Sequence, residues 1–422
     1  MLKTGYKKFA VLLVLLLFIL SAIGCSSSNS SGSTTAPVPN SHKQQEKTIS
    51  STKDRKSDAG SVLKVHFIDV GQADSILVQT PSGKNILIDG GNNDDADLLV
   101  NYLKDQDVKT LDYVIGTHPH EDHIGGLDVV IEMFEVEKVY LPKVSHTTKT
   151  YKDLLLAVKD KGVKIIPAKA GVKPDIDSEV KALFVAPNGA DYEEINNYSV
   201  VFKLTYGNTS FLFTGDAEAL SENEMLKSGF DLKSDVLKVA HHGSSSSTTP
   251  EFLKAVSPKY AVISVGTDND YGHPSEETLL KLNNFKVKIY RTDMQGTIIA
   301  TSDGESIKFN KSAITPKAAT KNISIIDINL RDEVVIIKNS SPQDVNMTGW
   351  TLISAKGNQI YHFPEDYVLK SGAIVRIWSG KNARNNPPGD LFWTNDYIWN
   401  NDGDTGILKD ADGYIVSSNG GN

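Results

Sequence analysis

Three histidines and two carboxylates lie within six positions of the segment THPHEDHIGG, residues 117–126. Histidine is scarce in this chain, with ten in 422 residues, so the cluster needs a chemical explanation. Imidazole nitrogens and carboxylate oxygens are ligands that suit zinc, manganese and iron. The apolar run LDYVIG before the cluster is typical of a buried strand, and in the loop after a strand side chains can converge. The spacing therefore predicts a metal site that uses His118, His120, Asp122 and His123.

Two later apolar segments also end in residues that can bind metal. FLFTGDAE delivers Asp216 at the tip of an expected strand, where a carboxylate can bridge two cations, and a plain turn aspartate is the less favoured interpretation. VLKVAHHGS ends in His241 and His242. Because adjacent strand residues point to opposite faces, we expect only one of this pair to be a ligand. We favour His242, which abuts the turn at Gly243, and expect His241 to support or pack against the site.

HxHxDH, a strand-end Gly-Asp and a later strand-end His together resemble the metallo-β-lactamase superfamily. The resemblance extends to the hydrolase domain of ComEC-type competence proteins, which handle incoming DNA. It covers residues 62–309 and is carried by VHFIDVGQADSILVQTPSGKNILIDGG, NNYSVVFKL, FLFTGDAE, LKVAHHGS, YGHPS and YRTDMQGTI. Ala73 departs from the glycine that this family usually has in DVGQGD. The resemblance implies an α/β fold, the αββα sandwich, and the alternation of strand and helix patterns along this block agrees with two sheets covered by helices.

The resemblance also implies two divalent metal ions, zinc or manganese, and a supporting role for Asp89 in LIDGG. The second ion would be held by Asp122, His123, Asp216 and His242. The first would have His118, His120 and the bridging Asp216. The third histidine of lactamases is missing there, because the chain has Asn196, Asn197 and Ser199 before the SVVFKL strand, with Asn197 as an alternative ligand. This departure disfavours a β-lactam substrate and favours a phosphoester.

The implied chemistry is metal-assisted hydrolysis. A bound divalent cation lowers the pKa of a water molecule from about 15.7 to about 7, and a pair of cations can clamp a phosphodiester. We expect Asp122 to orient the attacking water while it binds metal. We expect His273 in YGHPS to protonate the leaving oxygen or bind phosphate, although a structural histidine in a turn fits the sequence as well.

The last block, residues 323–422, has short strand patterns separated by Gly, Asn, Asp and Pro, which favours an all-β sandwich. Its segments TGWTL and WNNDGDTGIL resemble a lamin tail domain over residues 323–417, which implies an immunoglobulin-like sandwich that binds a surface or polymer ligand. All four tryptophans lie here, and we expect them to fill the core rather than to display a carbohydrate-binding surface. For Asp402 and Asp404 we favour a solvated turn over a calcium loop.

The beginning of the chain predicts export. Residues 1–25 have a basic start and an apolar run shorter than the roughly 20 residues of a spanning helix. The run ends in Ala22-Ile23-Gly24-Cys25, which resembles a lipobox, so we expect lipid attachment at Cys25 and a location at the outer face of a bacterial membrane. An uncleaved N-terminal anchor is the alternative. Residues 26–61 have the composition of a flexible tether, and residues 310–322 that of a linker.

The composition limits the choice of function. Cys25 is the only cysteine, so disulfides and thiolate metal sites are excluded. The net charge of −8 is unlike the basic footprint of a nucleic-acid binder, although Lys203, Lys238 and Arg291 lie near the site segments, where such side chains are usually solvated. We favour a nuclease or phosphodiesterase that acts on extracellular DNA or RNA. A cell-wall phosphodiesterase that resembles teichoic acid phosphorylcholine esterase, and a non-catalytic surface-binding protein, are the alternatives.

Overall fold

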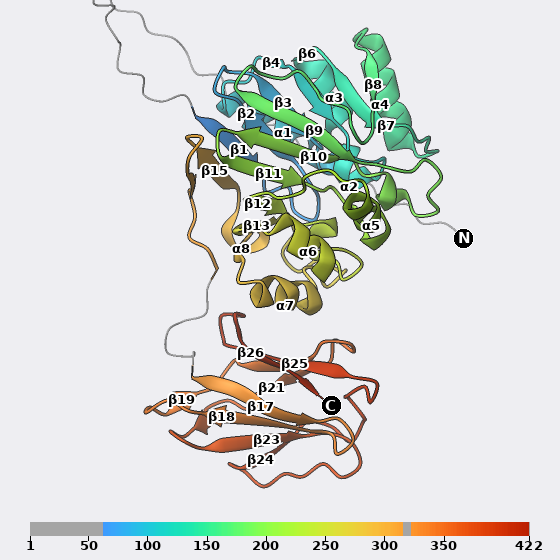
Figure 1. Ribbon diagram of the computed structural model, residues 1–422. Coiled ribbons are helices and arrows are strands. Elements are labelled where there is room, and N and C mark those ends of the chain that lie inside the picture. Colours follow the sequence, from blue (N-terminus) through green and yellow to red (C-terminus); the bar gives the residue numbers. More distant parts are fainter. Residues whose placement is uncertain (1–61, 315–321, 422) are drawn as a thin grey trace, which may run out of the picture. The chain divides into compact units, whose positions relative to one another are not determined.

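The computed structural model describes residues 62–314 and 322–421 (Figure 1). The predicted signal peptide, Cys25, the tether and residues 315–321 of the predicted linker lie outside the described residues. Within the described ranges, no helix is both long and apolar enough to cross a membrane.

The first part of the chain, residues 62–314, contains two large β-sheets. One has eight strands in the order β16-β15-β1-β2-β3-β5-β7-β8, and the other has six in the order β14-β13-β12-β11-β10-β9. The strands of the first sheet are β1 (Leu63–Phe67), β2 (Ile76–Gln79), β3 (Asn85–Ile88), β5 (Tyr113–Ile115), β7 (Val139–Pro142), β8 (Ile165–Ala168), β15 (Ile298–Ser302) and β16 (Ile307–Phe309). The strands of the second are β9 (Val180–Ala186), β10 (Val201–Tyr206), β11 (Thr209–Phe213), β12 (Val236–Lys238), β13 (Tyr260–Ile263) and β14 (Lys288–Arg291). A small separate pair is formed by β4 (Thr110–Leu111) and β6 (Glu135–Val136).

The helices of this part are short, and hydroxyl side chains cap several of them. Thr148, Thr249 and Ser275 each accept a hydrogen bond from a backbone N–H in the first turn of α4, α6 and α7. The α-helices are α1 (Ala96–Asp105), α2 (Glu121–Ile124), α3 (Leu127–Met133), α4 (Lys149–Asp160), α5 (Ala219–Lys227), α6 (Pro250–Val256), α7 (Glu276–Asn284) and α8 (Thr292–Gln295). Three 3-10 turns complete the set, η1 (Asn93–Asp95), η2 (Ile195–Tyr198) and η3 (His241–Gly243).

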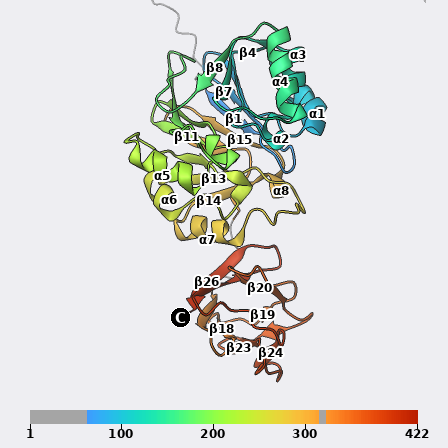
Figure 2. The same ribbon diagram turned by 90° about the vertical axis from the view of Figure 1, so that its right-hand side faces the viewer.

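The hydrophobic residues of this part form three clusters, which define four layers. Alternate residues of β3 show why: Ile86 and Ile88 lie in the cluster between the sheets, whereas Leu87 lies in the cluster under α1, α3 and α4. The third cluster lies between the six-stranded sheet and α5, α6 and α7. Figure 2 shows the two groups of helices on opposite sides of the strands. The predicted αββα sandwich is therefore confirmed.

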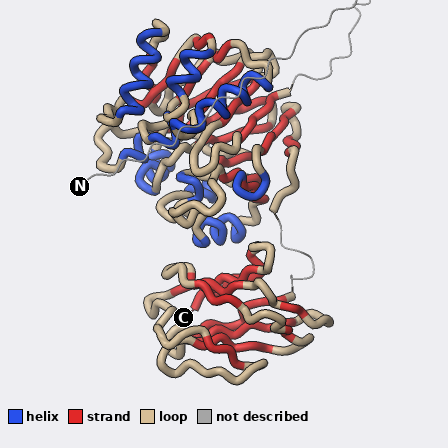
Figure 3. Tube along the Cα trace, turned by 180° about the vertical axis from the view of Figure 1, so that it is seen from behind, coloured by secondary structure: helices blue, strands red, loops and turns tan. Residues whose placement is uncertain are grey.

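The second part, residues 322–421, contains strands and loops but no helix among its described residues (Figure 3). Two four-stranded sheets, β17-β18-β23-β24 and β21-β20-β25-β26, enclose one hydrophobic core, and β19 and β22 form a separate pair. The strands are β17 (Ile323–Asn329), β18 (Val334–Asn339), β19 (Val345–Asn346), β20 (Thr351–Ser354), β21 (Ile360–His362), β22 (Val368–Leu369), β23 (Ile374–Trp378), β24 (Asp390–Phe392), β25 (Asp404–Lys409) and β26 (Ile415–Gly421). The predicted all-β sandwich is confirmed.

Two predictions for this part need correction. Trp350 and Trp399 are buried in the core as expected, and Trp393 is half-buried and packs against it. Trp378 is half-buried outside this core, where its ring lies under Arg384. Asp404 is neither a solvated turn residue nor a free calcium ligand. It is 5% exposed, and its carboxylate accepts hydrogen bonds from the Ser354 hydroxyl and from the backbone N–H groups of Thr405 and Lys356. The aspartate therefore ties the start of β25 to the end of β20.

Candidate metal centre

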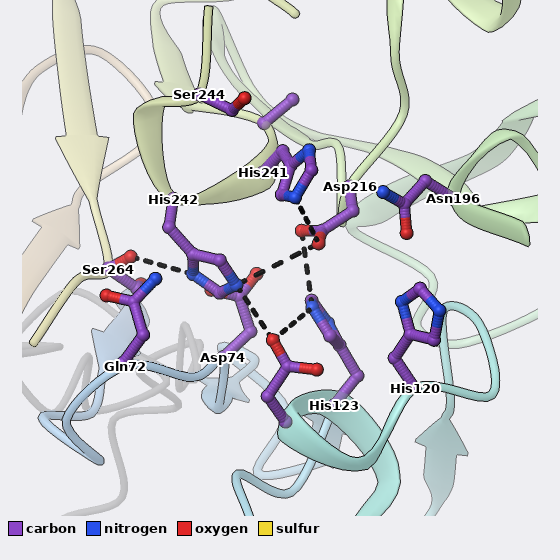
Figure 4. Close-up of polar contacts among 12 residues, drawn as sticks. Gln72, Asp74, His120, His123, Asn196, Asp216, His241, His242, Ser244 and Ser264 are labelled. Carbon is purple, nitrogen blue, oxygen red and sulfur yellow. Dashed lines mark hydrogen bonds and ion pairs between the residues drawn. The ribbon is translucent and has the colours of Figure 1, made fainter. Parts of the chain in front are cut away.

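The predicted ligands lie in loops that follow the carboxyl ends of parallel strands. β3 and β5 are parallel neighbours in one sheet, and β11, β12 and β13 are parallel neighbours in the other. Parallel strands end at the same edge of a sheet, so the loops after them meet. Segments far apart in the sequence thereby bring together His118, His120, Asp122, His123, Asp216 and His242, as Figure 4 shows for part of the set.

Four of the predicted residues form the site that was assigned to the second metal ion. Asp122, His123, Asp216 and His242 each offer one ligand atom, and these atoms lie within 4.8 Å of one another. His123 Nε2 lies 3.2 Å from Asp216 Oδ1, and His242 Nε2 lies 3.2 Å from Asp122 Oδ2. Two imidazoles and two carboxylates at such distances match the donor set of a zinc or manganese site.

The second group lies on the other side of Asp216. His118 Nε2 is 3.0 Å from His120 Nδ1 and 4.0 Å from Asp216 Oδ2. His118 is 1% exposed, while His120, at the start of α2, is half-buried. Asp216 is thus shared by both groups, which is the arrangement that a bridging carboxylate requires.

The choice between His241 and His242 rested on a strand that the structure does not have. β12 ends at Lys238, and both histidines lie in η3 with positive φ values of 48° and 50°. The alternation rule for strands therefore does not apply to them. Each Nε2 lies 3.8 Å from Asp216 Oδ2, but only His242 also lies 3.2 Å from Asp122 Oδ2. His241 approaches Asp216 from another direction (Figure 4). The geometry makes His241 a candidate ligand of the site that contains His118 and His120.

Asp89, for which the resemblance implied a supporting role, contacts Thr117 and His123 of the HxHxDH loop. Its carboxylate accepts hydrogen bonds from the Thr117 backbone N–H at 2.7 Å and hydroxyl at 2.8 Å. The His123 Nδ1 lies 2.8 Å from Asp89 Oδ2, which turns Nε2 of the same ring toward Asp216. Supporting carboxylates of this kind fix the tautomer and orientation of metal-binding histidines.

Asp74 and Lys238 support the other side, and sequence analysis missed their role. Lys238 Nζ lies 2.8 Å from Asp74 Oδ2, and both side chains are at most 2% exposed. Asp74 Oδ1 is 3.4 Å from His242 Nδ1, which also lies 3.0 Å from the Ser264 carbonyl. Burial alone would raise the pKa of Asp74, but the charge of Lys238 keeps this pKa below its usual value. The sequence shows only that Asp74 precedes one apolar strand segment and that Lys238 ends another, which does not predict that the two form a pair.

Glu218 is a third supporting carboxylate that sequence analysis missed. Its Oε1 lies 3.3 Å from His241 Nδ1 and accepts hydrogen bonds from Ser246 Oγ at 3.0 Å and Asn196 Nδ2 at 3.3 Å. The hydrogen bond with His241 lowers the pKa of Glu218. One carboxylate thus orients both His241 and Asn196.

The two asparagines in η2 have different environments. Asn196 lines the cavity of the metal centre, whereas Asn197 accepts a hydrogen bond from the Ser221 backbone N–H and lines a neighbouring cavity. The structure therefore turns Asn197, the alternative ligand named from the sequence, away from the centre. Consecutive residues of a 3-10 turn are about 120° apart, since the turn has about three residues, so only one of the two can face inward.

The charges at the centre favour a bound cation. Burial opposes a proton on His123, yet the carboxylates of Asp216, Asp122 and Asp89 hold its pKa well above the usual value. His242, which burial also disfavours as a cation, has its pKa raised to about 10 by Asp216, Asp122 and Asp74. His123 Nε2 and Asp216 Oδ1 are buried and make no hydrogen bond. These carboxylates require positive charge between them, and the donor set fits divalent metal ions.

A cavity of about 300 Å³ opens above the ligands. It is lined by Gln72, His120, Glu121, Asp122, Asn196, Asp216, His241, His242, Tyr271 and His273. His273, a predicted catalytic residue, thus reaches the cavity, where burial and the neighbouring His241 lower its pKa to about 4 and keep the ring neutral at pH 7. Its buried Nδ1 makes no hydrogen bond.

The three basic residues that lie near the site segments in the sequence each pair with an aspartate. Lys238 is buried against Asp74, Lys203 binds the side chain and carbonyl of Asp231, and Arg291 Nε donates to Asp293 at 3.0 Å. The expectation that they are solvated is therefore wrong for Lys238, which is 1% exposed, and for Lys203, which is 8% exposed. Among the residues that the structure describes, no lysine or arginine lines the cavity of the metal centre. His146, which sequence analysis did not name, lies beside His120, with the two ring centroids 6.3 Å apart.

Comparisons with known families agree with both parts of the fold. Residues 68–267 match the family model of the metallo-beta-lactamase superfamily, and residues 316–420 match that of the lamin tail domain.

Three curated relatives match the first part. ComE operon protein 3 of Bacillus subtilis is 32% identical over 252 residues, which cover 56% of this chain and 32% of the relative. Competence protein ComA of Neisseria gonorrhoeae is 30% identical over 232 residues, covering 54% and 31%. Recombination protein 2 of Haemophilus influenzae is 28% identical over 241 residues, covering 56% and 28%. The chain therefore spans about a third of the length of these relatives.

Solved structures show weaker similarity. A metallo hydrolase from the archaeon Ignicoccus hospitalis aligns with a TM-score of 0.36 and 17% identity, covering 56% of this chain and 98% of that one. A metal-dependent hydrolase of the β-lactamase superfamily aligns with a TM-score of 0.39 and 14% identity, covering 54% and 95%.

Proposed function

We propose that this protein, in which a metallo-β-lactamase superfamily hydrolase domain precedes a lamin tail domain, is a metal-dependent phosphodiesterase that acts on DNA or RNA. One observation carries the proposal: Asp216 belongs to a group of four converging ligands with Asp122, His123 and His242. The same buried carboxylate lies 4.0 Å from His118, which is paired with His120. Two metal centres that share a ligand suit hydrolysis of phosphate esters. Relatives named as competence and recombination proteins favour nucleic acid as the substrate.

The residues around the cavity have distinct roles in this proposal. Bound divalent cations, zinc or manganese, would activate a water molecule and neutralise charge on the phosphate. Asp122, whose side chain is 31% exposed, faces the cavity and orients the attacking water while it binds metal. His273 is neutral at pH 7, so it binds a phosphate oxygen as a hydrogen-bond donor rather than as a charge. Its alternative role as an acid for the leaving oxygen is disfavoured by the same lowered pKa.

A second candidate function is supported by the charge of the surroundings. The described residues that line the cavity of the metal centre include no lysine or arginine. A neighbouring cavity of about 380 Å³ is lined by four carboxylates, those of Asp191, Glu193, Glu194 and Glu218. Acidic walls repel a polyanion but attract a substrate that carries a cationic group beside its phosphate. A cell-wall phosphodiester with a choline group is such a substrate. A non-catalytic role is disfavoured, because all six predicted ligands are present and brought together.

A substrate panel tests the proposal. The purified protein, with manganese or zinc, is offered plasmid DNA, single-stranded DNA, RNA and a choline phosphodiester. We expect cleavage of nucleic acid, loss of cleavage in His120→Ala, and a lower kcat with unchanged metal content in His273→Gln. Cleavage of the choline compound alone would reverse the order of the two candidate functions. Activity that persists in His120→Ala would show that the site is wrong.

The location of the protein and the role of its lamin tail domain belong to the same proposal. We place the enzyme at the outer face of a bacterial membrane, held by lipid at Cys25, with the lamin tail domain as the part that binds a surface or polymer. Cys25 lies outside the described residues, so this step depends on the sequence alone. In Cys25→Ala, we expect the protein to leave the membrane fraction of the expressing cells. Retention of that variant in the membrane fraction would contradict lipid attachment and favour an uncleaved anchor.

A further inference from the structure

Asn196 has an oxygen atom that its own fold does not satisfy. The residue is 9% exposed, and Oδ1 is fully buried without a hydrogen-bond partner. A buried polar atom without a partner is uncommon in folded proteins and calls for an explanation. Asn196 lines the same cavity as His120, His241 and Asp216, and in Figure 4 its oxygen points toward His120.

The hydrogen bond to Glu218 fixes which end of the amide faces inward. Nδ2 of Asn196 donates to Glu218 Oε1 at 3.3 Å, and a carboxylate accepts from the nitrogen of an amide, not from its oxygen. The opposite orientation would place two oxygens against each other. Oδ1 must therefore be the atom that faces the centre. Glu218 is itself fixed by His241 and Ser246, so the amide is held from behind.

We infer that Asn196 Oδ1 is a ligand of the first metal ion, together with His118, His120, His241 and Asp216. The inference rests on the proposed two-metal centre and extends it, because a neutral amide oxygen takes the place of the third histidine of lactamases. The backbone supports this placement: the Val200 N–H donates to the Thr117 carbonyl at 2.9 Å, which joins the end of η2 to the HxHxDH loop.

The amide oxygen changes which cation the first site prefers. Carbonyl and carboxylate oxygens suit manganese, whereas imidazole suits zinc. An oxygen from Asn196 beside Asp216 makes the first site richer in oxygen than a three-histidine site. We therefore expect the first site to prefer manganese more strongly, relative to zinc, than it would with a histidine at position 196.

Metal binding in the purified full chain tests this inference without any substrate. Manganese binding is followed by equilibrium dialysis and by the loss of the free Mn²⁺ signal in electron paramagnetic resonance. Wild type should bind two ions. Asn196→Ala should weaken one of the two by at least about 10-fold, the scale on which even supporting residues affect metal affinity. Asn196→Asp, which keeps an oxygen at this position, should retain both.

Asn197→Ala is the matched control, because it removes the same side chain from the next residue, which faces away from the centre. Asn196→His gives a second measurement that does not depend on the folded fraction. Its ratio of zinc to manganese at saturation should rise by at least about 10-fold over wild type, in line with the ligand preferences of the two ions.

The outcomes separate this inference from the proposed function. If wild type binds two ions and Asn196→Ala binds both as tightly, the amide ligand is wrong and the two-metal centre stands. An unchanged metal ratio in Asn196→His would likewise overturn the amide ligand. If wild type binds fewer than two ions, the two-metal centre fails and the inference fails with it.

Discussion

Asp216→Asn is expected to lower phosphodiester hydrolysis by about 10³-fold or more, because a metal ion contributes several kcal/mol to transition-state stabilisation and each 1.36 kcal/mol is about tenfold in rate. The aspartate lies between both groups of ligands, with Oδ1 near His123 and Oδ2 near His118, His241 and His242. An amide offers one neutral oxygen where the carboxylate offers two charged ones. The variant should therefore lose affinity for both ions, not for one.

The measurement pairs steady-state hydrolysis with metal content after dialysis. Asp235→Asn is a suitable control, since this residue precedes β12 at the opposite end of the strand from the centre. Its carboxylate accepts hydrogen bonds from the backbone N–H and hydroxyl of Ser210 and pairs with the Lys259 ammonium at 2.9 Å. The control should retain two ions and a rate close to that of wild type, because the carboxylate contacts Ser210 and Lys259 and none of the proposed ligands. Full activity in Asp216→Asn would show that hydrolysis occurs elsewhere in the chain.

The segments that carry the candidate ligands were predictable, because each segment follows an apolar strand pattern. Parallel order places the loops after β11 and β12 at one edge of their sheet, which the sequence pattern can indicate. His118 follows β5 of the other sheet, so its meeting with Asp216 depends on how the two sheets pack, which no local pattern shows. The alternation of strand and helix patterns along the chain agreed with the layers that the resemblance implied. The opposite environments of Leu87 and Ile88 show that β3 is covered on both faces.

The errors arose where the backbone leaves regular structure. The sequence does not show that β12 stops at Lys238, so the two following histidines were treated as strand residues. The phase of η2 decides that Asn196 faces inward and Asn197 outward, and one residue of slip would exchange them. Glu218 was missed because its partners come from separate segments, and a contact of this kind has no local signature.

Lys238→Met is expected to destabilise the metal-free protein strongly. Lys238 and Asp74 form a buried ion pair at 2.8 Å, and the methionine would remove the nearest positive charge from the Asp74 carboxylate, leaving His242 at 3.4 Å as its positive neighbour. Removal of one partner from a buried pair costs about 3–5 kcal/mol. For a domain of this size, each kcal/mol shifts Tm by about 2–4 °C, so we expect a fall of roughly 6–20 °C. Thermal unfolding in the presence of a chelator measures this effect, since bound metal would add its own stabilisation.

The double variant Asp74→Asn/Lys238→Met separates stability from metal binding. With both charges removed, no unpaired charge remains in the core, and most of the lost Tm should return. His242 would still lack the carboxylate that contacts its Nδ1, leaving the Ser264 carbonyl as its main support. Supporting carboxylates affect metal affinity by about 10–100-fold, so the double variant should fold well and yet bind the second ion that much more weakly. Recovery of both properties would mean that the pair only fills the core, and recovery of neither would mean that Asp74 has a separate structural role.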